Sequence, residues 1–88
     1  MKKLAEVIEV ENEGLVSLLG QIVTIYCLNY IYTGELEGVN DACIKLKNPS
    51  LVFNTGDFDG KDWEDAQRFP HKYWYVKTDA IESFGIMK

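Results

Sequence analysis

The sequence predicts a single small β domain, a partly open barrel of five short and strongly bent antiparallel strands that follows a short helix. Three observations lead to this fold class. After residue 20, apolar and polar residues alternate with a period of two over several stretches, each long enough for one strand. Glycines interrupt the second stretch, which indicates sharp bending or a close approach of two backbones. The 88 residues are 47% apolar, enough for one core but not for a second domain.

The N-terminal part is predicted to contain one short helix, over residues 13–19. Asn12 can cap it, three leucines share one side, and Gly20 can end it in a left-handed turn. The preceding residues 4–11 are ambiguous, because they fit either a helix face or an alternating strand.

Five strands are expected to follow, joined mostly by short turns. They cover residues 21–29, 31–40, 42–48, 71–77 and 81–87. In the third strand, Ile44 and Leu46 are predicted to face inward. Pro49 either ends that strand or forces a bulge, after which the strand resumes. Residues 54–70 are polar, contain glycine and carry an aromatic residue every few positions, so they are predicted to form one long irregular loop.

The charge distribution argues against several classes of protein. The formal net charge is −5, which excludes a general nucleic-acid coat that works through bulk positive charge, so any RNA contact has to be local. The 21 residues between Glu13 and Glu35 are uncharged. Polar residues interrupt them and acids flank both ends, which favours a buried strand over a membrane helix. Acids also follow the basic start too soon for a signal peptide. We therefore expect a cytoplasmic protein with no membrane partner.

No arrangement of side chains in the sequence predicts catalysis, a metal site or a cofactor. His71 is the single histidine, and no second histidine or nearby cysteine accompanies it. Residues 57–62 carry acids at a spacing like that of a calcium loop, but the glycine and glutamate of such a loop are not at their positions. Cys27 and Cys43 form no CxxC motif and are predicted to be free. We expect a protein that is not an enzyme.

The order of these elements resembles that of the Sm/LSm family, as a divergent bacterial or phage-type member. The family has a short helix, five bent strands, a variable loop after the third strand and a short turn between the last two. The resemblance covers roughly residues 13–87. Its first motif corresponds to Gly20–Ile25, Tyr32–Leu36 and Asp41–Leu46, and its second to Val76–Phe84. The resemblance implies an Sm-like fold, that is, an SH3-like open barrel, with residues 1–88 as a single domain.

The resemblance also implies a ring. Sm-like subunits pair the fourth strand of one copy with the fifth strand of the next, so we expect a homo-oligomer of about five to seven subunits. This pairing covers strand edges that are otherwise exposed. Trp74 and Tyr75 point to opposite faces of a strand, so one is expected in the core and one at an interface. The expected interface residues are Tyr73, Trp74, Tyr75, Val76, Ile81 and Phe84.

An RNA-binding site is carried over from the family position by position. Asp41 keeps the aspartate of the first motif, although one extra residue separates it from Gly34 and implies a bulge. Cys43 stands where the family has a base-stacking aromatic residue or histidine, and Lys45 where it has a base-reading asparagine. The Arg-Gly of the second motif falls at residues 77–78. Together with a turn tyrosine that can stack on a base, the candidate RNA-binding residues are Asp41, Cys43, Lys45, Lys77, Thr78 and Tyr30.

Two functions of different classes follow. The first is a non-enzymatic ring that binds single-stranded RNA and takes part in RNA regulation. The alternative is a ring-forming or SH3-like protein-interaction or structural module without RNA binding, in which the loop 54–70 contacts protein. In the alternative, Asp41 only stabilises a turn, and Lys45 and Lys77 are solvated strand residues.

Overall fold

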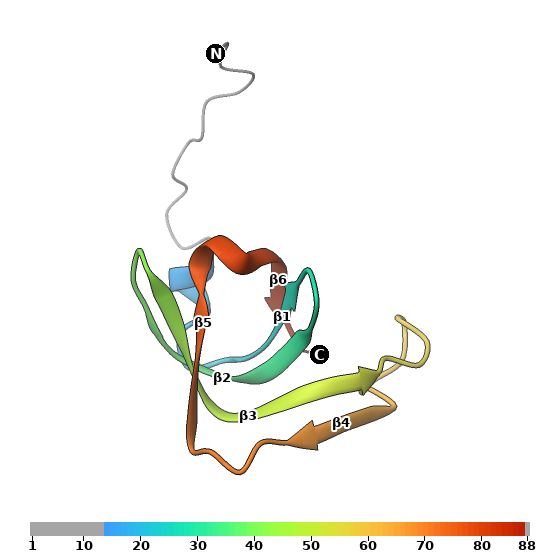
Figure 1. Cartoon of the computed structure of the whole chain (residues 1–88). Coiled ribbons are helices and arrows are strands. Elements are labelled where there is room, and N and C mark those ends of the chain that lie inside the picture. The colour runs from blue at the N-terminus through green and yellow to red at the C-terminus, as the bar shows by residue number, and fades with distance from the viewer. Residues whose placement is uncertain (1–13, 88) are drawn as a thin grey trace, which may run out of the picture.

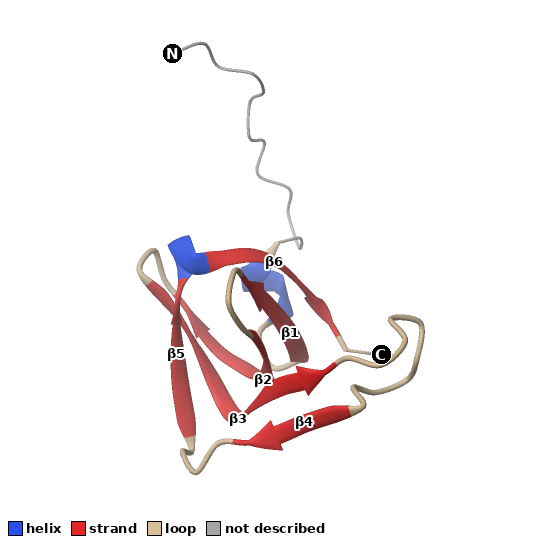
Figure 2. Ribbon diagram, turned by 45° about the vertical axis from the view of Figure 1, so that its right-hand side comes forward, coloured by secondary structure: helices blue, strands red, loops and turns tan. Residues whose placement is uncertain are grey.

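The computed structural model describes residues 14–87 and consists of one strongly bent antiparallel sheet (Figures 1 and 2). Its six strands are β1 (Ile22–Cys27), β2 (Ile31–Val39), β3 (Cys43–Asn54), β4 (Asp65–Arg68), β5 (Tyr73–Lys77) and β6 (Ile81–Ile86). Two short 3-10 turns accompany them, η1 (Leu15–Leu18) and η2 (Thr78–Ala80). The predicted mostly β class is confirmed.

The sheet is open, with two strands at its ends. The strand order is β4-β3-β2-β1-β6, and β5 also pairs with β3. β3 is long enough for two partners, because its first half, 43–47, pairs with β5 and its second half, 50–54, pairs with β4. Within residues 14–87, β4 and β5 each pair only with β3, and β6 pairs only with β1. Each of these three strands therefore keeps one free edge, and the sheet does not close.

The hydrophobic core lies inside the bend of the sheet. Alternation along each strand sends every second side chain to this inner face, and burying each aliphatic chain contributes about 1.5–3 kcal/mol. In β3, Ile44 and Leu46 are fully buried as predicted. The buried apolar residues are Val23, Ile25, Leu36, Ile44, Leu46 and Val76.

β3 bends where it changes partner, at Asn48 and Pro49. The register shifts by one residue between Thr33 and Glu35 of β2, so β3 holds one extra residue at this point. Asn48 has a positive φ of 52°, and Pro49 is fully buried. Of the two predicted outcomes at Pro49, the bulge followed by a resumed strand is confirmed.

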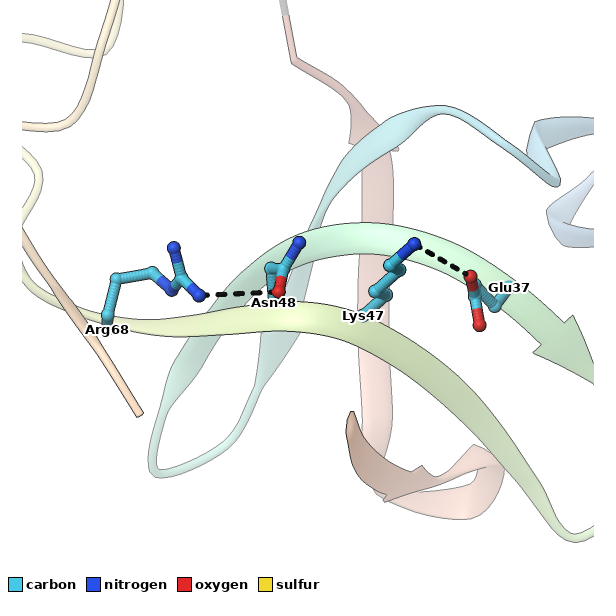
Figure 3. A network of polar contacts seen from close by, with 4 residues as sticks. All are labelled: Glu37, Lys47, Asn48 and Arg68. Carbon is cyan, nitrogen blue, oxygen red and sulfur yellow. Dashed lines mark hydrogen bonds and ion pairs between the residues drawn. The ribbon is translucent and has the colours of Figure 1, made fainter. Parts of the chain in front are cut away.

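Polar contacts hold this bend in place (Figure 3). The backbone N–H of Asn48 donates to the carbonyl of Lys72 at 2.8 Å, and the Arg68 guanidinium donates to Oδ1 of Asn48 at 3.3 Å. One step along β3, the ammonium of Lys47 lies 3.8 Å from the carboxylate of Glu37. The bend therefore connects β3 to its neighbours on both sides.

A second extra residue lies in β2. The register shifts between Leu36 and Gly38, which leaves Glu37 unpaired in the ladder. This is the bulge that the sequence predicted between Gly34 and Asp41, and its position is confirmed.

The predicted helix over 13–19 is wrong in kind. The chain forms only the four-residue 3-10 turn η1, because Gly14 and Gly20 take positive φ values of 84° and 86° on either side of it. The left-handed turn predicted at Gly20 is confirmed. The few residues between the two glycines cannot offset the cost of helix nucleation. The predicted cap Asn12 and the ambiguous residues 4–11 lie outside the described residues.

The prediction that 54–70 is one irregular loop is also wrong, because residues 65–68 form β4. All four side chains of β4 are exposed, so the sequence there has no alternation that could reveal a strand. β4 forms because the second half of β3 offers it a hydrogen-bonding edge.

Two smaller findings concern the cysteines and the membrane. Cys27 and Cys43 are free, as predicted. Among residues 14–87, no helix has the length and apolar character needed to cross a membrane.

Candidate nucleic-acid interface

Two turns that are far apart in the sequence meet at one end of the sheet. The hydroxyl of Thr78 donates to the carbonyl of Asp41 at 2.6 Å, and its backbone N–H donates to the carbonyl of Ala42 at 3.0 Å. Next to this contact, Cys43 and Lys77 are direct partners in the β3–β5 ladder. The structure thus brings together four of the six residues predicted for the RNA site, from both motifs.

Asn40 organises the turn between β2 and β3, and sequence analysis missed it. Its Oδ1 accepts hydrogen bonds from the backbone N–H of Ala42 at 2.8 Å and of Cys43 at 2.9 Å. Its own N–H donates to the carbonyl of Cys43 at 3.0 Å. An asparagine just before an aspartate is a common turn signal, so Asn40 could have been found from the sequence. It positions the backbone around Asp41.

Lys45 shares the outward face with Cys43 and Lys77 but points along the strand. It pairs with Tyr75 in the ladder, and its ammonium lies 4.0 Å from the ring centroid of Tyr73. A cation at this distance from a ring is attracted by about 0.5–1 kcal/mol when exposed. Lys45 is therefore held beside the site and not at its centre.

Tyr30 joins the site from the opposite side, through a groove. The groove has a volume of about 560 Å3 and separates the β1–β2 turn from β5. Tyr30 is 54% exposed, as predicted for a turn tyrosine, and Lys77 lines the same groove from β5. The groove residues include Cys27, Tyr30, Tyr32, Trp74, Lys77 and Asp79. Tyr30 and Lys77 therefore line one groove, from the β1–β2 turn and from β5.

Two groups in the groove, the Cys27 thiol and the Tyr32 phenol, are shifted toward their neutral forms. Burial raises the pKa of the Cys27 thiol, and the nearby Glu82 carboxylate raises it further. Burial also raises the pKa of Tyr32, with smaller contributions from Cys27 and Tyr30. Both groups stay neutral, so the groove does not repel a phosphate through them.

The residues expected at a subunit interface divide between core and surface. Val76 is only 5% exposed and packs in the core, whereas Tyr75 is 59% exposed. Trp74 is half-buried, with its ring centroid 4.7 Å from that of Phe69. Of the Trp74–Tyr75 pair, Trp74 is the residue that packs against the core. Tyr75 is exposed, and its place at a subunit interface stays a prediction.

Phe84 of β6 lies on the inner face of the sheet but is partly exposed to solvent. It is the ladder partner of the fully buried Ile25, so both side chains lie on the inner face of the sheet. Phe84 is nevertheless 40% exposed and Ile86 55% exposed, because no strand of residues 14–87 lies beyond β6. The remaining expected interface residues, Tyr73 and Ile81, are half-buried.

The described part of the chain, residues 14–87, contains no group of three histidine, cysteine or acidic side chains placed to hold a metal ion. Comparison with known proteins gives no match: no protein-family model, no curated protein and no solved structure is significantly similar to this chain.

Proposed function

We propose that the chain is a non-enzymatic, Sm-like subunit that assembles edge to edge into a homo-oligomeric ring and binds single-stranded RNA. The observation that carries the proposal is the meeting of the two motif segments at the Asp41–Thr78 hydrogen bond. The predicted extra residue in β2 supports the alignment of the first motif, because it restores the spacing between Gly34 and Asp41. On this alignment β4 is an addition to the five strands of the family.

Two of the three free edges, those of β5 and β6, support assembly. An unpaired strand edge exposes backbone donors and acceptors that another strand can satisfy. β5 and β6 are such edges, and antiparallel pairing of one subunit's β5 with the next subunit's β6 uses both. The same contact covers the inner-face side chains of Phe84 and Ile86, whose exposure is otherwise a cost to a domain of this size.

The groove between Tyr30 and Lys77 supports RNA as the ligand. Single strands bind where bases stack on aromatic rings and phosphates meet cations. Tyr30 offers an exposed ring, and Lys77 of β5 offers a cation in the same groove. Because a ring repeats the site once per subunit, a net-acidic protein can still concentrate lysines around one aperture. Asp41 acts through its backbone carbonyl, which accepts a hydrogen bond from Thr78 and so joins the β2–β3 turn to η2.

A charge-reversal experiment tests the RNA site separately from assembly. We expect Lys45→Glu combined with Lys77→Glu to abolish binding of a uridine-rich RNA, measured by fluorescence anisotropy at two salt concentrations, and to leave the oligomer mass unchanged. The matched control is Lys61→Glu combined with Lys72→Glu, which makes the same charge change outside strands β3 and β5. If the Lys45→Glu, Lys77→Glu variant still binds RNA and the control variant does not, the RNA site has been assigned to the wrong face.

The alternative function is a ring that binds protein and not RNA. It is favoured by the contacts of the β3 lysines, because Lys45 is already over a tyrosine ring and Lys47 is already paired with Glu37. On this alternative, the wild-type oligomer ignores RNA at moderate salt, and the double reversal changes nothing.

A further inference from the structure

The loop between β3 and β4 folds back over the outer face of β1 and β6. Trp63 of the loop shows this coverage, because its ring centroid lies 6.4 Å from that of Tyr26 of β1. Thr24, on the same face of β1, is only 4% exposed, and its hydroxyl donates to Sδ of Met87 at 2.7 Å. The loop is tied to itself by hydrogen bonds from the N–H of Gly60 to the carbonyl of Asp57, at 3.0 Å, and from Glu64 to Thr55, at 3.4 Å. Figure 2 shows this loop beside the C-terminal end of β6.

Three aromatic rings line one cavity under this loop. The cavity has a volume of about 170 Å3, and Tyr26 of β1 meets Phe58 and Trp63 of the loop there. The ring centroid of Trp63 lies 6.4 Å from that of Tyr26, at an interplanar angle of 84°, and 6.4 Å from that of Phe58, at 85°. Perpendicular rings at this separation can face a common point about 4.5 Å from each centroid, within the range of a cation–π contact.

Packing alone does not explain the choice of these rings. The indole nitrogen of Trp63 is buried and has no hydrogen-bond partner among residues 14–87, although buried tryptophans usually find one. Phe58 is 73% exposed, so it gains little from the core. Both rings therefore gain less from burial than aromatic side chains of a core usually do.

The charge around the cavity favours a cation. Residues 57–65 contain five acids and one lysine, and Asp62 is the one acid among the residues that line the cavity. Lys61 lines it as well and would oppose a cation. Among residues 14–87, ammonium groups lie over the ring of Tyr73 and over none of the three cavity rings. No ammonium group of the described residues therefore lies over these three rings.

We propose that this cavity binds a quaternary ammonium group, such as the trimethylammonium end of choline. Methylated nitrogen spreads its charge over apolar methyl groups, which can contact the three rings without losing hydrogen bonds to water. A primary ammonium would lose such hydrogen bonds and would find one carboxylate, that of Asp62, among the cavity side chains. The proposal does not rest on RNA binding, because the cavity shares no residue with the groove at β5. It borders the edge proposed for assembly, because Ile86 of β6 lines the cavity.

The test is an NMR titration of the full chain with choline chloride. The protein has two tryptophans, so its spectrum has two indole N–H signals, which a Trp63→Phe variant assigns. We expect choline to shift the Trp63 signal saturably and to leave Trp74 unchanged. The neutral isostere 3,3-dimethylbutanol, which has the same shape without the charge, should produce no saturable shift.

Variants distinguish binding by the three cavity rings from indirect effects on the conformation of the loop. Phe58→Ala should weaken choline binding by roughly threefold to thirtyfold, whereas Phe53→Ala, at a phenylalanine that is 60% exposed outside the cavity, should leave it unchanged. Lys61→Gln should strengthen binding, because it removes the opposing charge. The proposal is overturned if the isostere shifts Trp63 as strongly as choline does, if Phe58→Ala binds like the wild type, or if choline leaves Trp63 unshifted.

Discussion

Replacing Gly34 with alanine tests the bend of the sheet most locally. A Cβ atom at Gly34 would lie 3.1 Å from the carbonyl oxygen of Lys47 and 3.3 Å from Cα of Pro49. Both are backbone atoms of the β3 bulge, which the hydrogen bonds of Asn48 hold in place. They can move only if the bulge moves, so the substitution strains the structure.

The expected change in the free energy of unfolding combines two opposing effects. Overpacking of this kind costs about 1–3 kcal/mol. Alanine also restricts the unfolded chain, which raises the free energy of unfolding by about 0.4–1 kcal/mol where alanine can adopt the native backbone conformation. Gly34 is not among the glycines with a positive φ, so this gain applies to it. The net loss of about 1–2 kcal/mol should lower the Tm by roughly 5–15 °C.

Gly38→Ala is the matched control, since it lies in the same strand. Its Cβ would come no closer than 3.5 Å, to Cβ of Lys45, which is an ordinary contact. We expect its Tm to equal or exceed that of the wild type, measured by circular dichroism at one protein concentration for all variants. If Gly34→Ala were as stable as Gly38→Ala, the close approach of β2 to the β3 bulge would be wrong.

Three further predictions concern the turn, the alkaline range and the free edge. Asn40→Ala removes the acceptor of two backbone N–H groups and should lower the free energy of unfolding, measured by thermal melts, by about 1 kcal/mol. Asn40→Asp keeps an acceptor oxygen at this position and should retain most of the wild-type stability. The raised pKa values of Cys27 and Tyr32 mean that the folded state favours their neutral forms, so stability is complete below the unfolded values of 9.0 and 10.0 and falls as the pH rises above them. Tyr32→Phe should make that alkaline fall smaller, and an equally steep fall would contradict this reasoning. Phe84→Lys places a charge on the free edge and should reduce the oligomer to monomers in a scattering measurement, while Phe53→Lys should leave the mass unchanged.

The strand pattern was readable from the sequence because a sheet with one buried face imposes a period of two. Ile44 and Leu46 faced inward as expected, and the spacing from Gly34 to Asp41 predicted an extra residue that the register shift at Glu37 confirms. β4 was missed for the opposite reason. Its side chains are all exposed, so its backbone pairing with β3 leaves no trace in the side-chain pattern.

The candidate site was only partly predictable. Asp41 and Thr78 could be placed together because the resemblance supplied two motifs that meet in the fold. The position of Lys45 over Tyr73 could not, since a cation–π contact depends on the direction of two flexible side chains. The ring-lined cavity at Trp63 was equally hidden, because it requires a loop to fold back over β1, and the acidic composition of that loop indicated only solvation.

The central claim is that β5 and β6 are the joining edges of a ring that binds RNA. Native mass spectrometry of the full chain, alone and with a short uridine-rich RNA at moderate salt, tests it most directly. The account predicts a closed oligomer of one size that gains a single RNA molecule. A closed oligomer that ignores RNA would contradict the proposed ligand and favour a protein-binding ring. A monomer would contradict both the assignment of the edges and the Sm-like interpretation.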